Sequence, residues 1–276
     1  MPLTALVVGF VVAGCVVAPV GELAVVEPPS ASAAVRRRLV RTVVVRSVAA
    51  DAAPAAGGSR PVTPATPSPW ERFTGALAGP SYAVAHARGP VMPVSAFLGG
   101  PAIAGLSNPT KVGAPRVVLV VAETDEWLQV LLPLRPNNSL GWVQRRDVDL
   151  SVVSLRVEID RAAHRLRVFD GDVVVIDEPV AVGRPNTPTP AGQFFTTELL
   201  RPPNAGGAYG PYAFTLSAYS TVYQRFGSGD GAVGLHGTNE PRLLGSDASH
   251  GCIRIGNDAV SRLAALLPLG TPVVIR

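Results

Sequence analysis

Residues 249–257 read SHGCIRIGN and place a cysteine beside a serine, a histidine and a glycine. Cys252 is the one cysteine of the sequence after residue 15, and His236, followed by Gly237, lies sixteen residues before it. A thiol of ordinary pKa is about 97% protonated at pH 7, so a nucleophilic cysteine needs a base or a cationic neighbour. His236 can accept the thiol proton and hold an imidazolium beside the thiolate.

The glycine before Cys252 also fits acyl transfer. Gly251 lacks a side chain and lets backbone N–H groups approach a substrate carbonyl, where each donor of an oxyanion hole contributes about 3–4 kcal/mol. A nucleophile, a base and such donors together form an acyl-transfer site. Three alternatives are zinc ligation by His236, His250 and Cys252, a serine triad of Asp247, Ser249 and His250, and a purely structural Cys252. The zinc site lacks a CxxC or HExxH motif. The residues of the serine triad are so close in sequence that their side chains seldom meet at one site.

A mostly β unit with one supporting helix, residues 152–276, is expected to position these groups. Apolar residues alternate with polar ones over 153–159, and Asp170-Gly171 is a strong hairpin signal. A helix is expected over 258–267, capped by Asn257 or Asp258 and ended by Pro268 and Gly270. Further strands are expected near 166–169, 173–176, 193–197, 212–217, 233–236, 252–255 and 271–275.

Residues 81–150 predict a small β-barrel, with strands at 117–122, 127–133 and 141–143 separated by turns. The pattern W-L-Q-V-L-L-P, R-P-N and G-W-V resembles the bacterial SH3-like module of cell-wall proteins. Two interpretations follow for its Trp127–Pro133 and Arg135–Arg146 segments. They could hold glycan or peptide near the site, or Trp127 and Trp142 could be the core of a barrel that spaces or braces its neighbour.

The first 33 residues are interpreted as a signal and lipoprotein anchor region. Residues 3–20 are apolar and uncharged, and the stretch ending at Cys15 resembles a bacterial lipobox. This resemblance predicts lipidation of that sulfur and a location on the outer face of the cytoplasmic membrane, in the periplasm or in the cell wall. The alternatives are a signal cut after Ala33 and an uncleaved anchor. Residues 34–80 are rich in Ala and Pro and predict an extended spacer. Export would leave Cys252 without an intramolecular disulfide partner.

Composition limits the remaining classes of function. The 276 residues suffice for one large or two modest domains. Hydrophobic residues make up 47% of the chain and charged ones 16%, which favours a β-rich protein over a helical bundle. The net charge is +4, but no basic stripe interleaved with aromatics is present, so a nucleic-acid partner is not expected.

The histidine and cysteine motifs together resemble the catalytic domain of the YkuD-like L,D-transpeptidases. His236-Gly237 followed by Ser249-His250-Gly251-Cys252-Ile253-Arg254 matches that family's signature, and residues 183–194, GRPNTPTPAGQF, are similar to a second family segment. The resemblance covers residues 152–276. It implies a β-sandwich-like catalytic domain, no metal or organic cofactor, and inhibition by carbapenems.

The resemblance also implies a reaction on peptidoglycan. Cys252 would attack the carbonyl of the third residue of a donor stem tetrapeptide, release D-alanine and pass the acyl group to an amine of an acceptor stem, with His236 as general acid and base. Ser249, His250 and Gly237 would shape the pocket, and Gly251 and Cys252 would give backbone donors. Arg254 stands where some members have Asn, and its contact is left open. The alternatives are an L,D-carboxypeptidase, an enzyme linking a protein to the wall, and an idle wall-binding protein.

Overall fold

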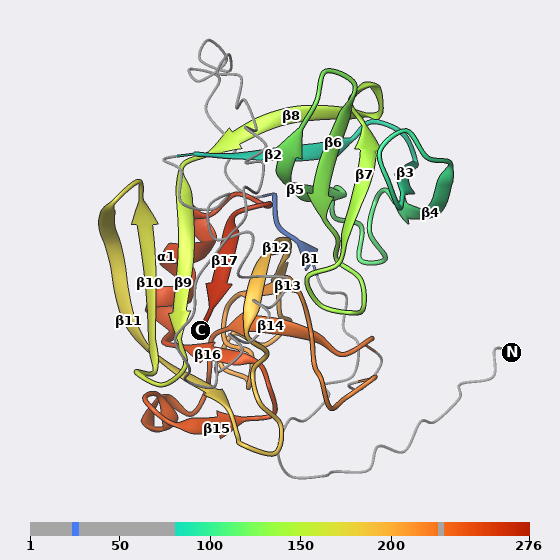
Figure 1. Ribbon diagram of the computed structural model, residues 1–276. Helices are drawn as coiled ribbons and strands as arrows, with labels where there is room; N and C mark the ends of the chain where they lie inside the picture. The colour runs from blue at the N-terminus through green and yellow to red at the C-terminus, as the bar shows by residue number, and fades with distance from the viewer. Residues whose placement is uncertain (1–23, 28–80, 226–228) are drawn as a thin grey trace, which may run out of the picture.

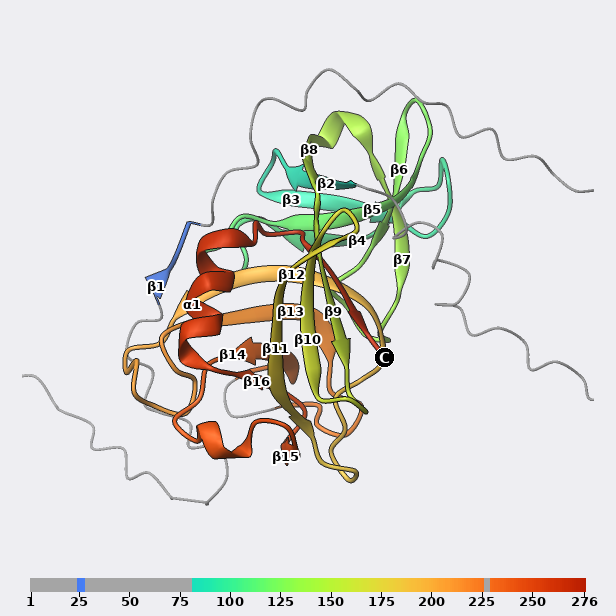
Figure 2. The same ribbon diagram turned by 90° about the vertical axis from the view of Figure 1, so that its left-hand side faces the viewer.

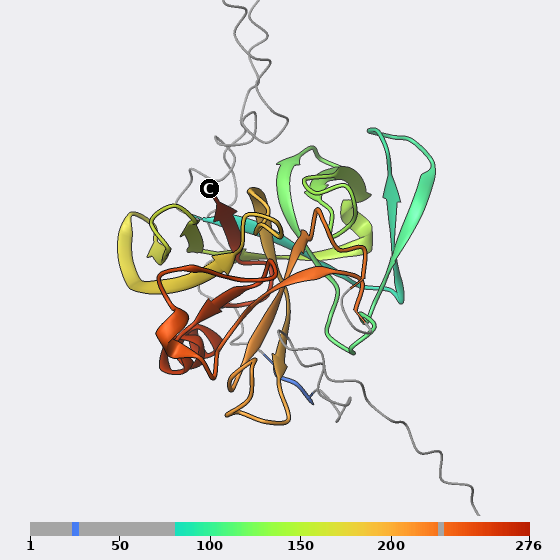
Figure 3. The ribbon, with the colours of Figure 1, turned by 90° about the horizontal axis from the view of Figure 1, so that it is seen from below.

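The computed structural model describes residues 24–27, 81–225 and 229–276, and these form two β-sheets and one α-helix (Figure 1). Cys15, the Ala33 cleavage site and the spacer of residues 34–80 lie outside the described residues. Strands from residues 82–153 form the sheet that we call the N-terminal sheet. Those from residues 155–275, together with one short strand near residue 24, form the C-terminal sheet. Seen from below, the two sheets lie side by side (Figure 3).

The N-terminal sheet has the strand order β4-β3-β7-β6-β5-β2-β8. Its strands are β2 (Tyr82–Ala87), β3 (Val91–Ser95), β4 (Ala102–Ser107), β5 (Val117–Glu123), β6 (Trp127–Leu131), β7 (Leu140–Gln144) and β8 (Val148–Val153). The strands predicted from β5 to β7 are confirmed. No strand was predicted at β2, β3 or β4. Pro93 interrupts β3, and β4 reads AIAGLS, in which apolar and polar residues do not alternate.

The C-terminal sheet closes on itself. Its strands are β1 (Ala24–Val25), β9 (Leu155–Asp160), β10 (Arg165–Asp170), β11 (Val173–Gly183), β12 (Gly192–Arg201), β13 (Ala213–Tyr219), β14 (Ala232–His236), β15 (Asp247–Ser249), β16 (Ile253–Ile255) and β17 (Pro272–Ile275). The first half of β12 pairs with β17 and its second half with β13, while β17 also pairs in parallel with β9. The layers of the expected sandwich-like fold are therefore joined into one ring of strands, because β12 serves as the corner (Figure 2).

The period-two pattern predicted for the start of this sheet is confirmed. Val157 and Ile159 on β9 are buried opposite Val168 and Leu166 on β10, and these apolar side chains belong to the main core. The hairpin joining β10 to β11 turns at Gly171, whose φ of +58° suits glycine in a tight turn.

The helix α1 (Asn257–Leu266) lies close to its predicted position, but its predicted side-chain cap is wrong. The N-cap residue is Gly256, and no side chain bonds to the first turn. Asn257 instead accepts a hydrogen bond from the N–H of Thr238 at 2.8 Å, two residues after His236. Its side chain therefore fastens the chain beyond β14 rather than the helix end. In the described part of the chain no helix has the length and apolar character needed to cross a membrane.

Strand β1 comes from the region interpreted as the anchor. Ala24 and Val25 pair antiparallel with Arg201 and Leu200 of β12, and the N–H of Val26 donates to the next β12 carbonyl at 3.1 Å. Figure 1 shows this short blue strand beside β12. Residues 24–26 therefore extend the C-terminal sheet, although some fifty residues separate them from the next described strand.

Candidate active site

Cys252 and His236 lie on neighbouring strands of the C-terminal sheet. β16 begins directly after Cys252 and pairs in parallel with β14, with His236 opposite Arg254. Gly234 precedes His236 by two residues on β14, so both face the same side of the sheet. A Cβ at Gly234 would lie 3.7 Å from Cys252 Sγ and 3.4 Å from His236 Cδ2. Both side chains therefore lie at ordinary contact distance from this one position, and the sheet brings the predicted nucleophile and base together.

The hydrogen bond of His236 determines which ring nitrogen carries the proton. Nδ1 lies 2.7 Å from the carbonyl oxygen of Gly237. A carbonyl oxygen can only accept, so Nδ1 donates and Nε2 of the neutral ring keeps its lone pair. Nε2 is buried and has no hydrogen-bond partner within the described residues. The local backbone therefore holds His236 as a proton acceptor through Nε2.

Burial lowers the pKa of His236 from 6.5 to about 4. Loss of hydration disfavours the imidazolium and is the largest cause; the hydrogen bond to Gly237 opposes it, and the charge of Arg254 adds to the lowering. The ring is consequently neutral at pH 7. At rest the ring is therefore in the form that can accept the thiol proton.

The buried neutral ring also makes stability depend on pH. In the unfolded chain His236 takes up a proton near pH 6.5, whereas in the folded protein it does so only near pH 4. Between these values the unfolded state binds more protons, so the free energy of unfolding falls as the pH falls, by on the order of 3 kcal/mol at most. Urea unfolding at pH 7 and pH 4.5 should show a smaller loss for His236→Gln than for the wild type. Equal losses in both proteins would contradict the buried neutral ring.

Ser249 folds the turn that presents Cys252. Its hydroxyl donates to the carbonyl of Cys252 at 2.6 Å and accepts from the N–H of Gly251 at 3.0 Å. Gly251 has a φ of +120°, a conformation that side chains rarely allow. The Gly251 N–H is engaged by Ser249 in this conformation. Its service as an oxyanion donor, and the contribution of Ser249 to the pocket, stay predictions.

The Thr-Pro-Thr-Pro segment supports this turn from the outside. Thr189 Oγ1 accepts the N–H of Gly183 and donates to the carbonyl of Gly251, both at 2.9 Å. Thr187 Oγ1 donates to the carbonyl of Ser249 at 3.4 Å. A Cβ at Gly183 would lie 2.5 Å from the backbone nitrogen of Thr189, which explains the glycine. Sequence reasoning gave these threonines no role, although their alternation with proline marked the segment.

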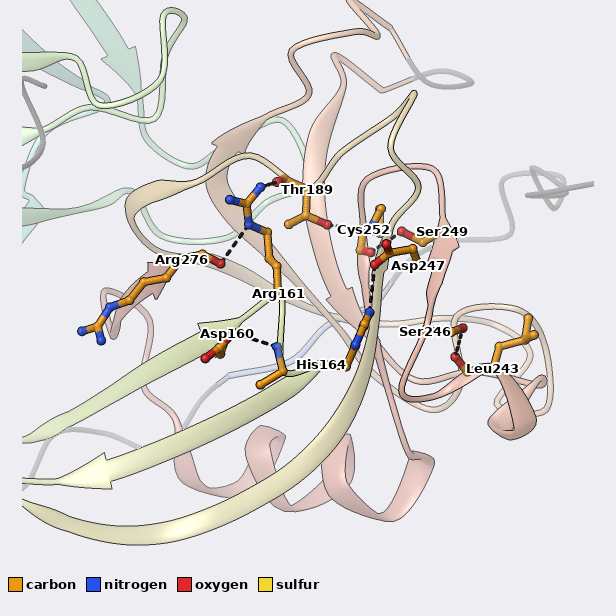
Figure 4. Close-up of polar contacts among 12 residues, drawn as sticks. Asp160, Arg161, His164, Thr189, Leu243, Ser246, Asp247, Ser249, Cys252 and Arg276 are labelled. Atoms are coloured by element: carbon orange, nitrogen blue, oxygen red, sulfur yellow. Dashed lines mark hydrogen bonds and ion pairs between the residues drawn. The ribbon is translucent and has the colours of Figure 1, made fainter.

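Arg161 joins the same segment to the end of the described chain. Its Nη1 donates to the carbonyl of Thr189 and its Nε to the carbonyl of Arg276, both at 2.9 Å. Figure 4 shows Arg161 between these two residues, with Thr189 turned toward Ser249 and Cys252. The sequence offered no signal for this contact, because both acceptors are backbone carbonyls.

Arg254 forms the contact that the sequence left open. Its Nη1 lies 3.1 Å from Oε2 of Glu240, and its side chain is largely buried. The charge of Arg254 contributes to lowering the pKa of His236 and of His250. For His250, burial is the main cause and Arg184 comes next. The cationic residues around the site therefore favour neutral imidazoles.

Gly237 lies in a tightly packed corner beside His236. A Cβ there would meet the side-chain oxygen of Asn257 and would lie 2.9 Å from the Cα of Gly210. The nearby ring of Tyr209 is tilted by 54° to that of His236, with 4.7 Å between their centroids. The predicted pocket residue Gly237 thus acts through close packing, and Tyr209 is a contact of the base that the sequence did not indicate.

The serine-triad alternative does not fit the contacts. Asp247 Oδ1 lies 2.8 Å from Nε2 of His164, and the Ser249 hydroxyl is bonded to the carbonyl of Cys252 (Figure 4). His164, which the sequence did not single out, is therefore a partly buried partner of Asp247. Among the described residues, no three His, Cys, Asp or Glu side chains gather as metal ligands do.

The comparisons with known proteins match the part of the chain that contains this site. A family model of the L,D-transpeptidase catalytic domain, YkuD, matches residues 154–275. YkuD of Bacillus licheniformis is 37% identical over 123 residues, which are 45% of this chain and 66% of that protein. YkuD of Bacillus subtilis strain 168 is 34% identical over 127 residues, 46% of this chain and 69% of that protein. This chain belongs to the L,D-transpeptidase family.

The L,D-transpeptidase catalytic domain thus begins with β9 and ends with β17, and it contains Cys252 and His236. The chain spans about two thirds of the length of these curated relatives. Among solved structures, L,D-transpeptidase 3 from Mycobacterium tuberculosis, in complex with a faropenem-derived adduct, is 18% identical; the match covers 58% of this chain and 91% of that chain with a TM-score of 0.38.

Proposed function

We propose that this L,D-transpeptidase cross-links peptidoglycan stem peptides through a thioester on Cys252. The observation that carries the proposal is the buried, neutral His236, whose Nε2 is the proton-accepting atom on the strand beside Cys252. A positioned base of this kind is what a protonated thiol needs to become a nucleophile. Membership in the family supplies the class of substrate.

In the first step, His236 Nε2 takes the thiol proton while Cys252 Sγ bonds to the carbonyl carbon of the third residue of a donor tetrapeptide. Backbone N–H groups of the Ser249–Cys252 turn would stabilise the oxyanion of the tetrahedral intermediate, with the N–H of Gly251 exchanging its bond to Ser249 for one to the oxyanion. The C–N bond to the terminal D-alanine then breaks, and the imidazolium returns the proton to the leaving amine. The products are free D-alanine and an acyl-enzyme thioester.

In the second step, an amine of an acceptor stem attacks the thioester carbon. His236 removes the amine proton, the C–S bond breaks, and the thiolate of Cys252 takes the proton back from the imidazolium. An amide cross-link and the original thiol result. Water in place of the amine would make the enzyme an L,D-carboxypeptidase, and an amine of a protein would make it a protein–wall linking enzyme.

Incubation with purified disaccharide-tetrapeptide tests this assignment. Mass spectrometry should show a cross-linked dimer that has lost one D-alanine. Disaccharide-tripeptide without dimer would instead indicate the carboxypeptidase. If neither product appears and no thioester forms on the protein, the non-catalytic wall-binding alternative remains. Carbapenems provide a second probe, since opening of the strained lactam by Cys252 Sγ would leave a stable acyl-enzyme.

The organisation of the chain is part of the proposal. Residues 81–150 would be an SH3-like module, and residues 152–276 the catalytic domain, with a linker over residues 34–80. The seven strands of the N-terminal sheet, counted over the described residues, support a small β module at that place. Its connection to the catalytic domain is short, because a single residue separates β8 from β9.

We also propose export and lipid anchoring at Cys15, which would place the enzyme on the outer face of the cytoplasmic membrane, in the periplasm or in the cell wall. Strand β1 favours this route over a cut after Ala33. A cut after Ala33 would remove Ala24 and Val25 from the edge of β12, whereas a cut before Cys15 retains them.

Metabolic labelling with an alkyne fatty acid tests the anchor. In a host with lipoprotein machinery the wild type should be labelled and Cys15→Ser should not, because the sulfur carries the lipid. Mature protein beginning at Ala34 would contradict this route, and so would a labelled Cys15→Ser variant.

A further inference from the structure

The loop joining β6 to β7, residues 132–139, reaches from the N-terminal sheet to the catalytic domain; we call it the docking loop (Figure 1). Its Arg135 donates three hydrogen bonds to backbone carbonyls across the junction. Nη1 bonds to Ser220 at 2.7 Å, and Nη2 bonds to Tyr223 at 2.9 Å and Asp230 at 3.1 Å. One guanidinium thus binds both the beginning and the end of the connection between β13 and β14.

Asn137 of the docking loop continues this contact onto the end of β13. Its Nδ2 donates to the carbonyl of Tyr219 and its Oδ1 accepts the N–H of the same residue, both at 2.8 Å. The Tyr219 hydroxyl donates back to the carbonyl of Pro133 at 2.8 Å, and Arg135 lies 4.8 Å above the tyrosine ring. The polar groups in this contact are therefore satisfied in pairs, as in a built interface.

Asn138 holds a second segment of the catalytic domain. Its Oδ1 accepts the N–H of Gln193 at 2.9 Å, and its own φ of +62° is one that asparagine tolerates. A Cβ at Gly192 would lie 2.7 Å from that oxygen. The glycine lets the asparagine reach the backbone at the start of β12.

Both segments held by the docking loop lie within a few residues of positions that contact Cys252 or the residue before it. Gly192 follows Thr189 by three residues, and Thr189 bonds to the carbonyl before Cys252. On the other side, Gly231 precedes Gly234 by three residues, and Gly234 lies against Cys252 Sγ. The docking loop therefore binds two stretches of chain, one leading from the threonine that supports the Cys252 turn and the other leading to the glycine beside Cys252 Sγ.

We propose that Arg135, Asn137 and Asn138 are positioning residues for acylation of Cys252, supplied by the N-terminal module. They hold the start of β12 and the approach to β14, so that the chain around the thiol is set for an acyl donor. The proposal rests on the proposed function of Cys252. It also favours a bracing role for the module, because Arg135 is committed to the catalytic domain and not to wall polymer.

The test compares variants of the full chain that differ in one polar contact. Asn138→Ala removes the acceptor for the Gln193 N–H, whereas Asn138→Asp retains an oxygen there and tolerates the same backbone conformation. Arg135→Ala removes the three bonds to backbone carbonyls. Arg88→Ala is the matched control, because Arg88 bonds to Asp149 within the N-terminal sheet at 2.8 Å.

Comparing a carbapenem with iodoacetamide distinguishes a loss of positioning from a loss of thiol reactivity. Asn138→Ala and Arg135→Ala should be acylated by a carbapenem about tenfold or more slowly than the wild type, since small displacements of positioning groups cost that much or more. Asn138→Asp and Arg88→Ala should stay within about twofold. Alkylation by iodoacetamide, which needs only the thiol and its base, should stay within about twofold in all four. Unchanged carbapenem rates, equal loss with both reagents, or no rescue by Asn138→Asp would each overturn the proposal.

Hydrogen–deuterium exchange keeps this test distinct from that of the function. A wild type that forms no carbapenem adduct would refute the proposed function. The amide exchange rates of residues 192–197 and 230–236 would still report whether the docking loop stabilises these two segments. Residues 230–236 should exchange faster in Arg135→Ala than in the wild type. Residues 192–197 should exchange faster in Asn138→Ala. Unchanged exchange in these variants would overturn the positioning role by itself.

Discussion

The Cys252→Ala variant is expected to gain no mass from a carbapenem, while the wild type gains a single adduct in an intact-mass measurement. The reason is that no other side chain at the site has the nucleophilicity of a thiol paired with a base at neutral pH. The same variant should form no thioester with disaccharide-tetrapeptide. We expect Cys252→Ala to have no transpeptidase turnover, because it forms no acyl-enzyme whose acyl group could be transferred to an acceptor.

Peptide mapping provides the control for this result, because Cys15 is the other cysteine of the sequence. The adduct should lie on the peptide that contains Cys252. Cys252→Ser, which keeps the size and the hydrogen-bonding ability of the side chain, should leave the fold intact and form little or no adduct. An adduct surviving on Cys252→Ala would remove the thiol from the role of nucleophile.

Replacement of His236 by Ala is expected to slow carbapenem acylation by about 10²–10⁴-fold, the usual range for losing a positioned acid–base group. In the wild type the pKa of His236 near 4 keeps the ring neutral at pH 5 to 6. Its capacity to accept the thiol proton is therefore lost only as the pH falls through about 4. We expect iodoacetamide alkylation and carbapenem acylation of the wild type to persist below pH 7 and to be much weaker in His236→Ala.

The matched control for the base is His164→Ala. His164 is a histidine of the same domain, but it is bonded to Asp247 rather than placed beside the thiol. We expect its variant to keep the wild-type rate within about twofold at each pH, since it loses no acid–base group of the reaction. Identical pH profiles for the wild type and His236→Ala would exclude His236 as the base.

The parts of the fold predicted from the sequence are those with a local pattern. Alternation over β9 and β10 and the turn at Gly171 indicate where side chains must face, so the hairpin could be predicted without knowing its neighbours. The candidate site was also predictable in part. Cys252 and His236 have few competitors of their residue types, and their spacing matches a known signature.

The parts that the sequence did not predict depend on backbone groups or on distant partners. The carbonyls that Arg135 and Arg161 bind exist at every residue, so no motif marks them. Closure of the sheet depends on β12 exchanging one partner strand for another, which a single strand pattern does not encode. The side chain of Asn257 had the right type for a cap, but a backbone N–H of another segment competed for it.

The ring of strands in the catalytic domain has a consequence for when this enzyme can first fold. β17 joins β9, whose partner residues lie more than a hundred positions earlier, and it also joins the start of β12. Pairings of such long range form slowly. The conformational entropy of the intervening chain must be lost before the strand–strand contacts can stabilise the fold. The ring cannot close on a ribosome until residues 272–275 have emerged, and the bond from Arg161 to Arg276 forms no earlier. A nascent chain therefore carries the thiol of Cys252 before its surroundings are complete, and we expect acyl transfer only after β17 has joined the ring.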